Sequence, residues 1–316
     1  MTTTLSARVS LLLGSLIVSA AAITVPAHAA TTYSQTKYPV VLVHGMSGFG
    51  NIGPVNYFYG VASDLSNNGA KVYTPAVSGF QSSEYRGEQL LTQVNSILAL
   101  SGAKKVNLIG HSHGSHTIRY VNGMIPAKIA SVTTVGGPNK GSAVADLITS
   151  ATSLPVVGSP VAGLLSSVVN GFGQLIGLGQ GQKLSQDSLA ALASLSTAGS
   201  AAFTKKFPAG MPTTSCGEGA YSQNGTLYYS WSGTSNLTNI LDPLDGGLAL
   251  TGLAFLGADN DGLVGRCSSH FGKVLRDNYA QNHLDEVNQI LGAVGLLQDP
   301  VSLYRIHANR LKVAGQ

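Results

Sequence analysis

Short apolar runs alternate along this chain with longer stretches of helical spacing. Val40–Val43, Val72–Tyr73, Val106–Ile109 and Ile129–Val135 are short and mostly apolar, as strands buried inside a parallel sheet are. The segment from Gly87 to Leu100 instead spaces its apolar residues as one face of a helix does, at Leu90, Leu91, Val94, Ile97 and Leu98. The alternation predicts an α/β fold, with a mostly parallel central sheet and helices on both faces.

The amino-terminal residues have the three-part layout of a secretory signal peptide. Arg8 precedes an apolar stretch from Val9 to about Ile23, and Ala27-His28-Ala29 offers a small-residue cleavage site. Glycine and serine interrupt the stretch, whereas a permanent membrane anchor needs about 20 continuous apolar residues. We therefore expect residues 1–29 to be removed, the protein to be secreted through the periplasm, and residues 30–316 to form a single domain.

Charge and cysteine content narrow the classes of function. The net charge of +4 is weak and evenly spread along the sequence, which does not favour a nucleic-acid partner. Cys216 and Cys267 are the only cysteines and both belong to the exported part. In an oxidising compartment such a pair most simply forms one disulfide, worth roughly 4 kcal/mol on a loop-closure model, although two free thiols are the alternative. No Cys/His cluster suggests zinc.

One long segment, from Leu147 to Gln182, contains no charged residue. Pro155, Pro160 and several glycines interrupt it too often for a membrane span. It could form a pair of buried helices over the sheet. The other interpretation is a mobile cover with an apolar inner face that opens at a lipid surface.

The pentapeptide Gly110-His111-Ser112-His113-Gly114 fits the pattern G-x-S-x-G between a predicted strand and a predicted helix. This is the context of a nucleophile elbow, where a serine lies on a tight turn and side chains at the flanking glycines would collide with backbone. A glycine-rich turn with an incidental serine is the alternative. The context favours Ser112 as a nucleophile.

A serine nucleophile needs a general base, and the base needs a carboxylate to orient it. The histidines after Ser112 are His113, His116, His270, His283 and His307. The first two are too close to Ser112 in sequence, and His283 is the best placed in a polar stretch near the carboxyl terminus. Asp261 lies on a turn upstream of it, but spacing alone leaves Asp242, Asp245 and Asp259 open.

An oxyanion hole requires two backbone N–H groups, one of them from the residue after the nucleophile. That residue is His113. The second donor should follow the strand ending at Val43, and His44-Gly45-Met46 points to the N–H of Met46. We expect His44 to hold this loop in place without taking part in the chemistry.

Together these motifs resemble those of the secreted bacterial true lipases of the Pseudomonas and Burkholderia type, within the α/β-hydrolase superfamily. The matching stretches run from about Tyr38 to Lys312, and they are Val43-His-Gly-Met46, Gly110-His-Ser-His-Gly114, Gly136-Gly-Pro-Asn-Lys-Gly141, Asn260-Asp-Gly-Leu-Val264, Asn282-His-Leu-Asp-Glu-Val-Asn-Gln289 and His307-Ala-Asn-Arg-Leu-Lys312. The resemblance implies triacylglycerol hydrolysis at a lipid–water interface by a triad of Ser112, Asp261 and His283.

The resemblance implies further features. The oxyanion N–H groups would belong to Met46 and His113, Cys216 would pair with Cys267, and a helical lid would lie within about 150–179. One structural Ca²⁺ would be bound by four residues, of which the last two use their backbone carbonyls: Asp242, Asp285, Gln289 and Ala293. Hard oxygen ligands of this kind suit calcium. A dedicated foldase would assist secretion.

Two other interpretations of the same residues remain. A hydrolase of soluble short-chain esters or of a polyester would use the same triad, and the uncharged segment favours the lipase over it. A binding protein on an inactive hydrolase fold would have lost a triad residue, and all three are present.

Overall fold

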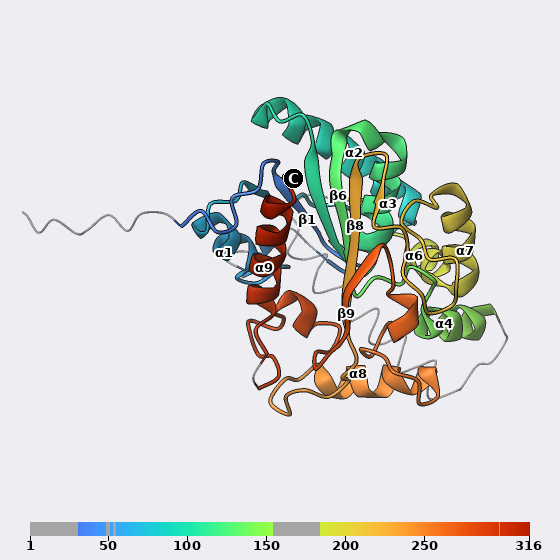
Figure 1. The fold of residues 1–316 in the computed structure, drawn as a ribbon. Coiled ribbons are helices and arrows are strands. Elements are labelled where there is room, and N and C mark those ends of the chain that lie inside the picture. Colours follow the sequence, from blue (N-terminus) through green and yellow to red (C-terminus); the bar gives the residue numbers. More distant parts are fainter. Residues whose placement is uncertain (1–30, 49–50, 53–54, 154–183, 297) are drawn as a thin grey trace, which may run out of the picture.

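The computed structural model describes residues 31–48, 51–52, 55–153, 184–296 and 298–316. A seven-stranded sheet forms its centre, in the order β4-β1-β5-β6-β8-β7 with β9 also paired to β8 (Figure 1). The strands are β1 (Val40–Val43), β4 (Val72–Tyr73), β5 (Val106–His111), β6 (Ile129–Val135), β7 (Ser222–Gln223), β8 (Thr226–Gly233) and β9 (Lys273–Tyr279). Every pairing is parallel except that of β7 with β8. A separate antiparallel pair joins β2 (Asn51–Ile52) to β3 (Val55–Asn56).

Helices flank the sheet. The α-helices are α1 (Val61–Asn67), α2 (Ser83–Ser101), α3 (Gly114–Met124), α4 (Ala143–Ser153), α6 (Ser188–Leu195), α7 (Thr197–Lys206), α8 (Asp245–Gly252) and α9 (Pro300–Val313). Single 3₁₀ turns are η1 (Pro126–Lys128), η2 (Leu253–Phe255), η3 (Arg266–Ser268) and η4 (Asp285–Val287). No described helix is long and apolar enough to cross a membrane.

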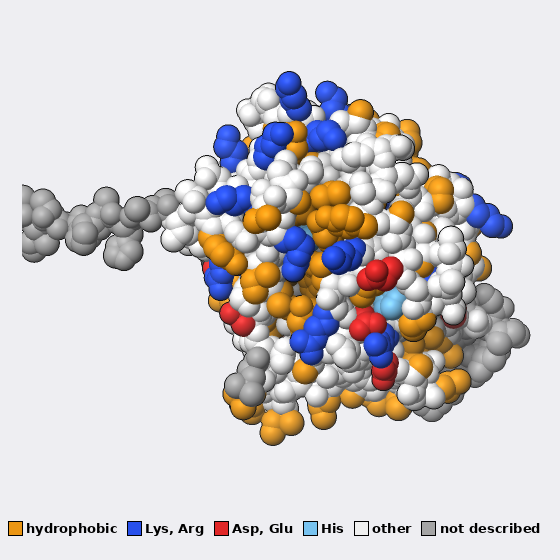
Figure 2. Space-filling view, in the orientation of Figure 1, with side chains coloured by type: hydrophobic (Ala, Val, Ile, Leu, Met, Phe, Trp, Pro, Cys, Tyr) orange, Lys and Arg blue, Asp and Glu red, His pale blue; other side chains and the backbone are white. Residues whose placement is uncertain are grey.

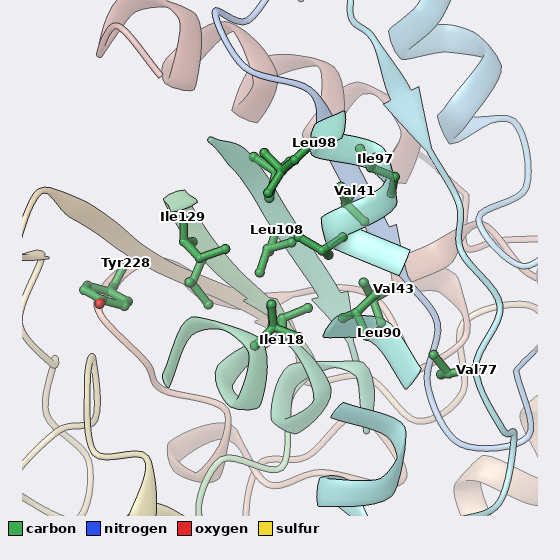
Figure 3. Packing of buried hydrophobic residues seen from close by; sticks show 14 of the residues in the cluster. Val41, Val43, Val77, Leu90, Ile97, Leu98, Leu108, Ile118, Ile129 and Tyr228 are labelled. Carbon is green, nitrogen blue, oxygen red and sulfur yellow. The ribbon is translucent and has the colours of Figure 1, made fainter. Parts of the chain in front are cut away.

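The alternation of side chains along β1 divides the hydrophobic core between the two faces of the sheet. Val41 and Val43 pack with α2 and α3 in one cluster, part of which is drawn in Figure 3. Val40 and Leu42 point to the other face, where they pack with residues of α1 and α9. Because neighbouring residues of a strand face opposite sides, a slip of one residue would exchange these two sets. Burial on both faces therefore fixes the register of the central strands.

The structure confirms the predicted α/β fold with a mostly parallel sheet and helices on both faces. The predicted helix from Gly87 to Leu100 is part of α2, which begins earlier because Ser82 caps it by accepting the N–H of Tyr85. Two predictions fall outside the described residues. These are the signal peptide over residues 1–29 and most of the lid over about 150–179, since α4 ends at Ser153 and the description resumes at residue 184.

Parallel strands also fix where chemistry can lie. The carboxyl ends of β1, β5, β6, β8 and β9 meet at one edge of the sheet, and their amino ends meet at the other. Ser112 follows β5 directly, and the loop with His283 follows β9. The candidate catalytic residues therefore gather at the carboxyl edge, which leads to α8 at the bottom of Figure 1.

Candidate active site

Ser112 lies at the turn between β5 and α3 in a strained conformation. Its φ is 55°, in the left-handed region that costs a non-glycine residue about 1–3 kcal/mol. Its N–H donates to the carbonyl of Val135 at 2.9 Å, which ties the turn to β6. A Cβ on Gly110 would lie 2.4 Å from the Gly114 oxygen, and one on Gly114 would lie 2.3 Å from the Val43 oxygen. Both glycines are therefore needed to hold Ser112 in this position.

His283 is paired with Asp261. Its ring Nδ1–H donates to Asp261 Oδ2 at 2.8 Å, and its backbone N–H donates to the Asp261 carbonyl at 2.9 Å. The other carboxylate oxygen, Oδ1, accepts the N–H groups of Leu263 and Val264 at 2.9 and 2.7 Å. Both side chains are buried. The carboxylate thus fixes both the orientation and the tautomer of the imidazole.

The alternative acids that the spacing left open have other partners. Asp259 forms an ion pair with Arg266 at 3.2 Å. Asp245 accepts the backbone N–H groups of Thr238 and Asn239 at 2.5 and 2.6 Å. Asp242 accepts the N–H of Leu244 at 2.8 Å.

The alternative bases also lie elsewhere. His270 contacts Asp277 at 3.0 Å, and His307 contacts the Thr133 hydroxyl at 2.8 Å. His113 and His116 both contact the hydroxyl of Ser83, at 2.9 and 3.2 Å.

The second ring nitrogen of His283 is available to accept a proton. His283 Nε2 is buried and has no hydrogen-bond partner in the described part of the chain. The ring lies beside the elbow, because its centroid is 4.6 Å from that of His111, the residue before Ser112. An unpartnered imidazole nitrogen on a ring that packs against the residue before the serine is available as the base that removes the proton of the nucleophile.

The loop after β1 packs directly against the elbow. A Cβ on Gly45 would come 2.7 Å from Ser112 Cβ, so the chain passes the nucleophile at this point and Met46 follows. His113, on the other side of Ser112, is the first residue before α3. The two expected oxyanion donors therefore flank Ser112 on the loop and at the helix start.

Arg86 donates hydrogen bonds that hold the loop after β1 in place. It is fully buried, and one of its nitrogens donates to the His44 carbonyl at 2.6 Å while others reach the Ser78 carbonyl and, at 3.1 Å, the Thr117 hydroxyl. Burial lowers the pKa of Arg86 to about 9, which leaves it charged at neutral pH. This role was not predicted from the sequence, because a lone arginine in a helix is normally a surface residue.

His44 itself holds the loop, as expected from the sequence. Its Nε2 accepts the N–H of Val77 at 3.1 Å, and its Nδ1–H donates to the Gly45 carbonyl at 2.9 Å. Burial, together with the charge of Arg86, lowers the pKa of His44 to about 3, so the ring stays neutral.

Comparison with known proteins agrees with this geometry. A model of the alpha/beta hydrolase fold matches residues 38–285. The chain belongs to the α/β-hydrolase family. A triacylglycerol lipase from Vibrio cholerae is 55% identical over 286 residues, 90% of each chain. A triacylglycerol lipase from Burkholderia plantarii is 42% identical, over 91% of this chain and 89% of its own. One from Pseudomonas fragi is also 42% identical, over 89% of this chain and 98% of its own. The resemblance predicted from the motifs is confirmed.

Solved structures support the same fold. The mature form of a Bacillus licheniformis lipase aligns with a TM-score of 0.58 at 22% identity, over 80% of this chain and 87% of that one. A metagenomic carboxyl esterase aligns with a TM-score of 0.55 at 18% identity, over 88% and 76%. At these identities the likeness concerns the fold alone.

Behind the catalytic histidine, this hydrolase buries a network that the sequence did not indicate. His111 Nε2–H donates to the His283 carbonyl at 2.9 Å, and the Tyr57 hydroxyl donates to His111 Nδ1 at 2.7 Å. Glu286 Oε1 accepts the N–H of Gly233 at 2.6 Å, and its Oε2 lies 3.3 Å from His111 Nε2. Burial, and then the charge of Asp261, raise the pKa of Glu286 well above its usual value.

His111, His283 and Glu286 lie close enough together to suggest a metal site in this hydrolase. Their hydrogen bonds argue against one. The Nε2 of His111 donates its proton to a carbonyl, so it has no lone pair for an ion, and burial raises the pKa of the glutamate, which favours its neutral form. The group is better explained as the support of the loop that carries His283.

Two of the four residues expected to bind calcium, Asp242 and Asp285, lie near each other beside that loop. Asp285 follows His283 by two positions, and burial and the nearby Asp245 and Asp242 raise its pKa to about 6. The pKa of Asp242 is also raised, first by burial. Asp242 Oδ2 and Asp285 Oδ1 are buried oxygens without a hydrogen-bond partner among the described residues. Asp242 also contacts the N–H of Ile290, which places it at the segment that contains Gln289 and Ala293.

The predicted disulfide is present in this hydrolase. Cys216 and Cys267 are bonded, with their Cα atoms 4.6 Å apart. Lys140 donates to the carbonyls of Ser215 and Cys267, at 2.6 and 3.3 Å, which fixes the bridge to the loop after β6. Because Cys267 follows Asp261 by six residues, the bridge anchors the segment that carries this acid.

Proposed function

We propose that this protein hydrolyses the ester bonds of triacylglycerols at a lipid–water interface, with Ser112 as nucleophile, His283 as general base and Asp261 as the residue that orients it. One observation carries the proposal: a buried His283, bound to Asp261 through Nδ1, has an unpartnered Nε2, and its ring packs against His111, the residue before the strained Ser112. The names of the relatives supply the substrate class.

The chemistry follows from these positions. Ser112 Oγ attacks the ester carbonyl carbon while His283 Nε2 takes the hydroxyl proton, and the backbone N–H groups of Met46 and His113 stabilise the oxyanion. His283 then gives the proton to the departing alcohol, which leaves an acyl group on Ser112. Water, deprotonated by His283, attacks this acyl group and releases the fatty acid and the free serine.

A lipid substrate is favoured over a soluble ester by the surface around the site. Exposed apolar side chains follow the carboxyl edge on and beside α8, here called the apolar rim: Leu237, Ile240, Leu241, Leu250, Leu253 and Leu256. Hydrophobic side chains line the lower border of Figure 2, where α8 lies in Figure 1. The two acids within this stretch, Asp242 and Asp245, are buried, so residues 234–258 expose no charge. Contiguous apolar surface of this kind marks an interaction surface, here one for lipid.

The rim is connected to the site. Ala254 and Phe255 pack with Met46 against a buried cluster that includes residues of α4 and α6. A lipid surface that contacts the rim therefore lies next to one of the oxyanion donors.

The first test compares an emulsified long-chain triglyceride with a soluble short-chain ester, using the wild type and Ser112→Ala. We expect fast hydrolysis of the emulsion by the wild type and a loss of about 10⁶-fold in the mutant on both substrates. Activity on the soluble ester alone would instead support the esterase or polyester hydrolase. A mutant with full activity would refute Ser112 as the nucleophile.

A second test separates the rim from the catalytic residues. The double variant Leu253→Ser/Leu256→Ser should lower the rate on the emulsion at least about tenfold, because it removes two exposed side chains that would enter lipid. Its rate on the soluble ester should stay within about twofold of wild type. Equal loss on both substrates would mean that the rim serves stability instead of lipid contact.

Calcium is the cofactor that fits the carboxylates near His283. Asp242 Oδ2 and Asp285 Oδ1 are buried oxygens that lack partners, and such atoms are costly unless a cation or a proton compensates them. Asp242 and Asp285, with the carbonyls of Gln289 and Ala293, would supply the hard oxygen ligands that Ca²⁺ prefers. A bound ion would neutralise the two carboxylates and hold the loop that carries His283, while the ester bond would be cleaved by protein groups alone.

Export and assisted folding complete the proposal. Their support is the signal-like layout of residues 1–29 and the resemblance to lipases that use a foldase. The first is tested by the amino-terminal sequence of protein recovered from culture medium, which should begin near residue 30. The second is tested by refolding yield with and without a foldase taken from a related bacterium.

A further inference from the structure

The fold brings together lysines that the sequence keeps far apart. Parallel strands place their amino ends on one edge of the sheet, and the loops that enter β1, β4, β5 and β6 each carry lysine. With one more at the end of α9, these residues form what we call the basic edge: Lys37, Lys71, Lys104, Lys105, Lys128 and Lys312. Segments 31–39, 68–71, 102–105, 125–128 and 312–316 contain no Asp or Glu. Charge that looked evenly spread along the sequence is therefore concentrated in space.

Figure 2 shows the same separation. Lys and Arg side chains gather along the upper border of the molecule, without acidic side chains among them, and hydrophobic side chains line the lower border. Neighbouring strands are about 4.8 Å apart, so the loops before β4, β1, β5 and β6 form a row of roughly 15 Å. The molecule thus has a basic edge and, opposite to it, a catalytic edge with an apolar rim.

The basic edge is not neutralised by its neighbours. Within the described residues, none of its six lysines forms an ion pair with an Asp or Glu. Lys37 lies over the ring of Tyr38 at 5.2 Å, and Lys312 donates to the carbonyl of Thr32 at 2.5 Å. The side chains of Lys71, Lys104 and Lys128 are exposed. A row of unpaired cations produces a positive potential that attracts polyanions.

A hollow of about 530 Å³ lies at one end of this row. Three lysines of the basic edge line it, namely Lys37, Lys71 and Lys312. Its other hydrogen-bonding side chains include Gln35, Thr36 and Ser101. Hydrogen-bonding groups around a hollow of this size suit a ligand that carries hydroxyl groups as well as negative charge.

We propose that the basic edge binds an acidic polysaccharide, a polymer that carries carboxylates on its sugar units. The row of cations matches a linear polymer with regularly spaced charges, and the hydrogen-bonding side chains of the hollow at its end suit a hydroxyl-rich sugar unit. Binding there leaves Ser112, at the opposite edge, facing away from the polymer. The protein would be retained on such a polymer while its catalytic edge stays open to substrate.

Three other polyanions fit the surface less well. An anionic lipid surface at the basic edge would turn the catalytic edge away from the lipid. Nucleic acids and phosphate groups are preferentially recognised by arginine, whose fork matches phosphate, whereas every cation in this row is lysine. An acidic peptide would be anchored by side chains in apolar pockets, whereas three lysines and several hydroxyl and amide groups line this hollow.

The test measures binding of the full mature chain to polygalacturonate, with the fully methyl-esterified polymer as the uncharged control. Affinity for polygalacturonate should fall severalfold between about 50 and about 200 mM salt, because binding releases counterions. The variant Lys71→Gln/Lys104→Gln/Lys128→Gln should bind about tenfold more weakly at low salt and hydrolyse a soluble ester at the wild-type rate.

A matched variant removes the same charge elsewhere. Lys205→Gln/Lys206→Gln/Arg276→Gln alters α7 and β9 and should bind as the wild type does. Equal weakening in both variants would mean that net charge, and not the basic edge, determines binding. Binding to polyglutamate as tight as to polygalacturonate, or no binding to polygalacturonate at low salt, would overturn the assignment to a polysaccharide.

Discussion

At the scale of single residues, the glycines around Ser112 determine whether the elbow can form. A Cβ at Gly114 would meet the Val43 oxygen at 2.3 Å, and this oxygen belongs to backbone that cannot move without disturbing β1. By contrast, a Cβ at Gly246 would meet nothing within 4 Å. The two positions therefore provide a matched pair for testing the elbow.

We expect Gly114→Ala to destabilise the protein by several kcal/mol, within the range of severe overpacking. Gly246→Ala lies inside α8, where alanine is preferred over glycine, and should stabilise by about 0.5–1 kcal/mol. Urea denaturation of both variants measures the difference. If Gly114→Ala were as stable as the wild type, the described packing of the elbow would be wrong.

Arg86 offers a second prediction at this scale. Lysine keeps the charge but cannot reach the His44 carbonyl, the Ser78 carbonyl and the Thr117 hydroxyl together. Arg86→Lys should therefore lower kcat on a soluble ester about tenfold, because the loop that carries Met46 is less well held. KM should change little, since the substrate does not contact Arg86.

The control for Arg86 is Arg305→Lys, which changes a surface pair with Asp64 and should leave kcat unchanged. Equal effects of the two substitutions would show that Arg86 has no special connection to catalysis. A loss of stability in Arg86→Lys with unchanged kcat would mean that Arg86 supports folding only.

At the scale of elements, the sequence predicted best what a repeating pattern encodes. The bounds of β1, β4 and β6 agree with the predicted runs. β1 and β6 are buried on both faces, which favours mostly apolar residues, and β4 is a half-buried strand at the edge of the sheet. The start of α2 was missed since its first turns bury Ser83 and Arg86, which no hydrophobic pattern marks. The network of Glu286 and His111 was missed for the same reason. Buried polar groups depend on partners that are distant in sequence, and spacing does not identify these partners.

The loop from Asp285 to Ala293 provides a prediction about a single element. If Ca²⁺ compensates Asp242 and Asp285, adding millimolar Ca²⁺ to protein treated with a chelator should raise Tm by several degrees, because an ion that binds only the folded state stabilises it. Asp242→Asn should lose most of this shift. Asp259→Asn, on the neighbouring exposed loop, should keep it. An equal Tm with and without Ca²⁺ would remove calcium from the proposal.

At the scale of the whole molecule, the parallel sheet separates two kinds of surface. Its carboxyl edge carries the candidate catalytic residues and the apolar rim, and its amino edge carries unpaired lysines. Neither concentration is visible in the sequence, where the residues of each edge are separated by long intervening elements. One topological fact, that all central strands run in the same direction, produces both.

Buried neutral histidines connect the stability of the whole molecule to pH. Burial, as the first cause, lowers the pKa of five of them, which are His44, His111, His113, His116 and His307. In the unfolded chain each would titrate near 6.5. Below that pH the unfolded state binds protons that the folded state does not, so the free energy of unfolding falls as pH decreases. Glu286 acts in the opposite direction, because burial raises its pKa in the folded state well above its usual value.

We therefore expect the free energy of unfolding to be highest above about pH 6.5. Between about pH 6.5 and about pH 5.5 it should fall by several kcal/mol, because each buried histidine contributes up to about 1.4 kcal/mol per pH unit. Urea denaturation at a series of pH values measures the slope. His307 lies on α9, away from the catalytic residues. His307→Gln should reduce the slope of the free energy of unfolding against pH by the contribution of one histidine, whatever its effect on absolute stability. An unchanged slope would mean that His307 is protonated in the folded state, contrary to its complete burial beside Arg310.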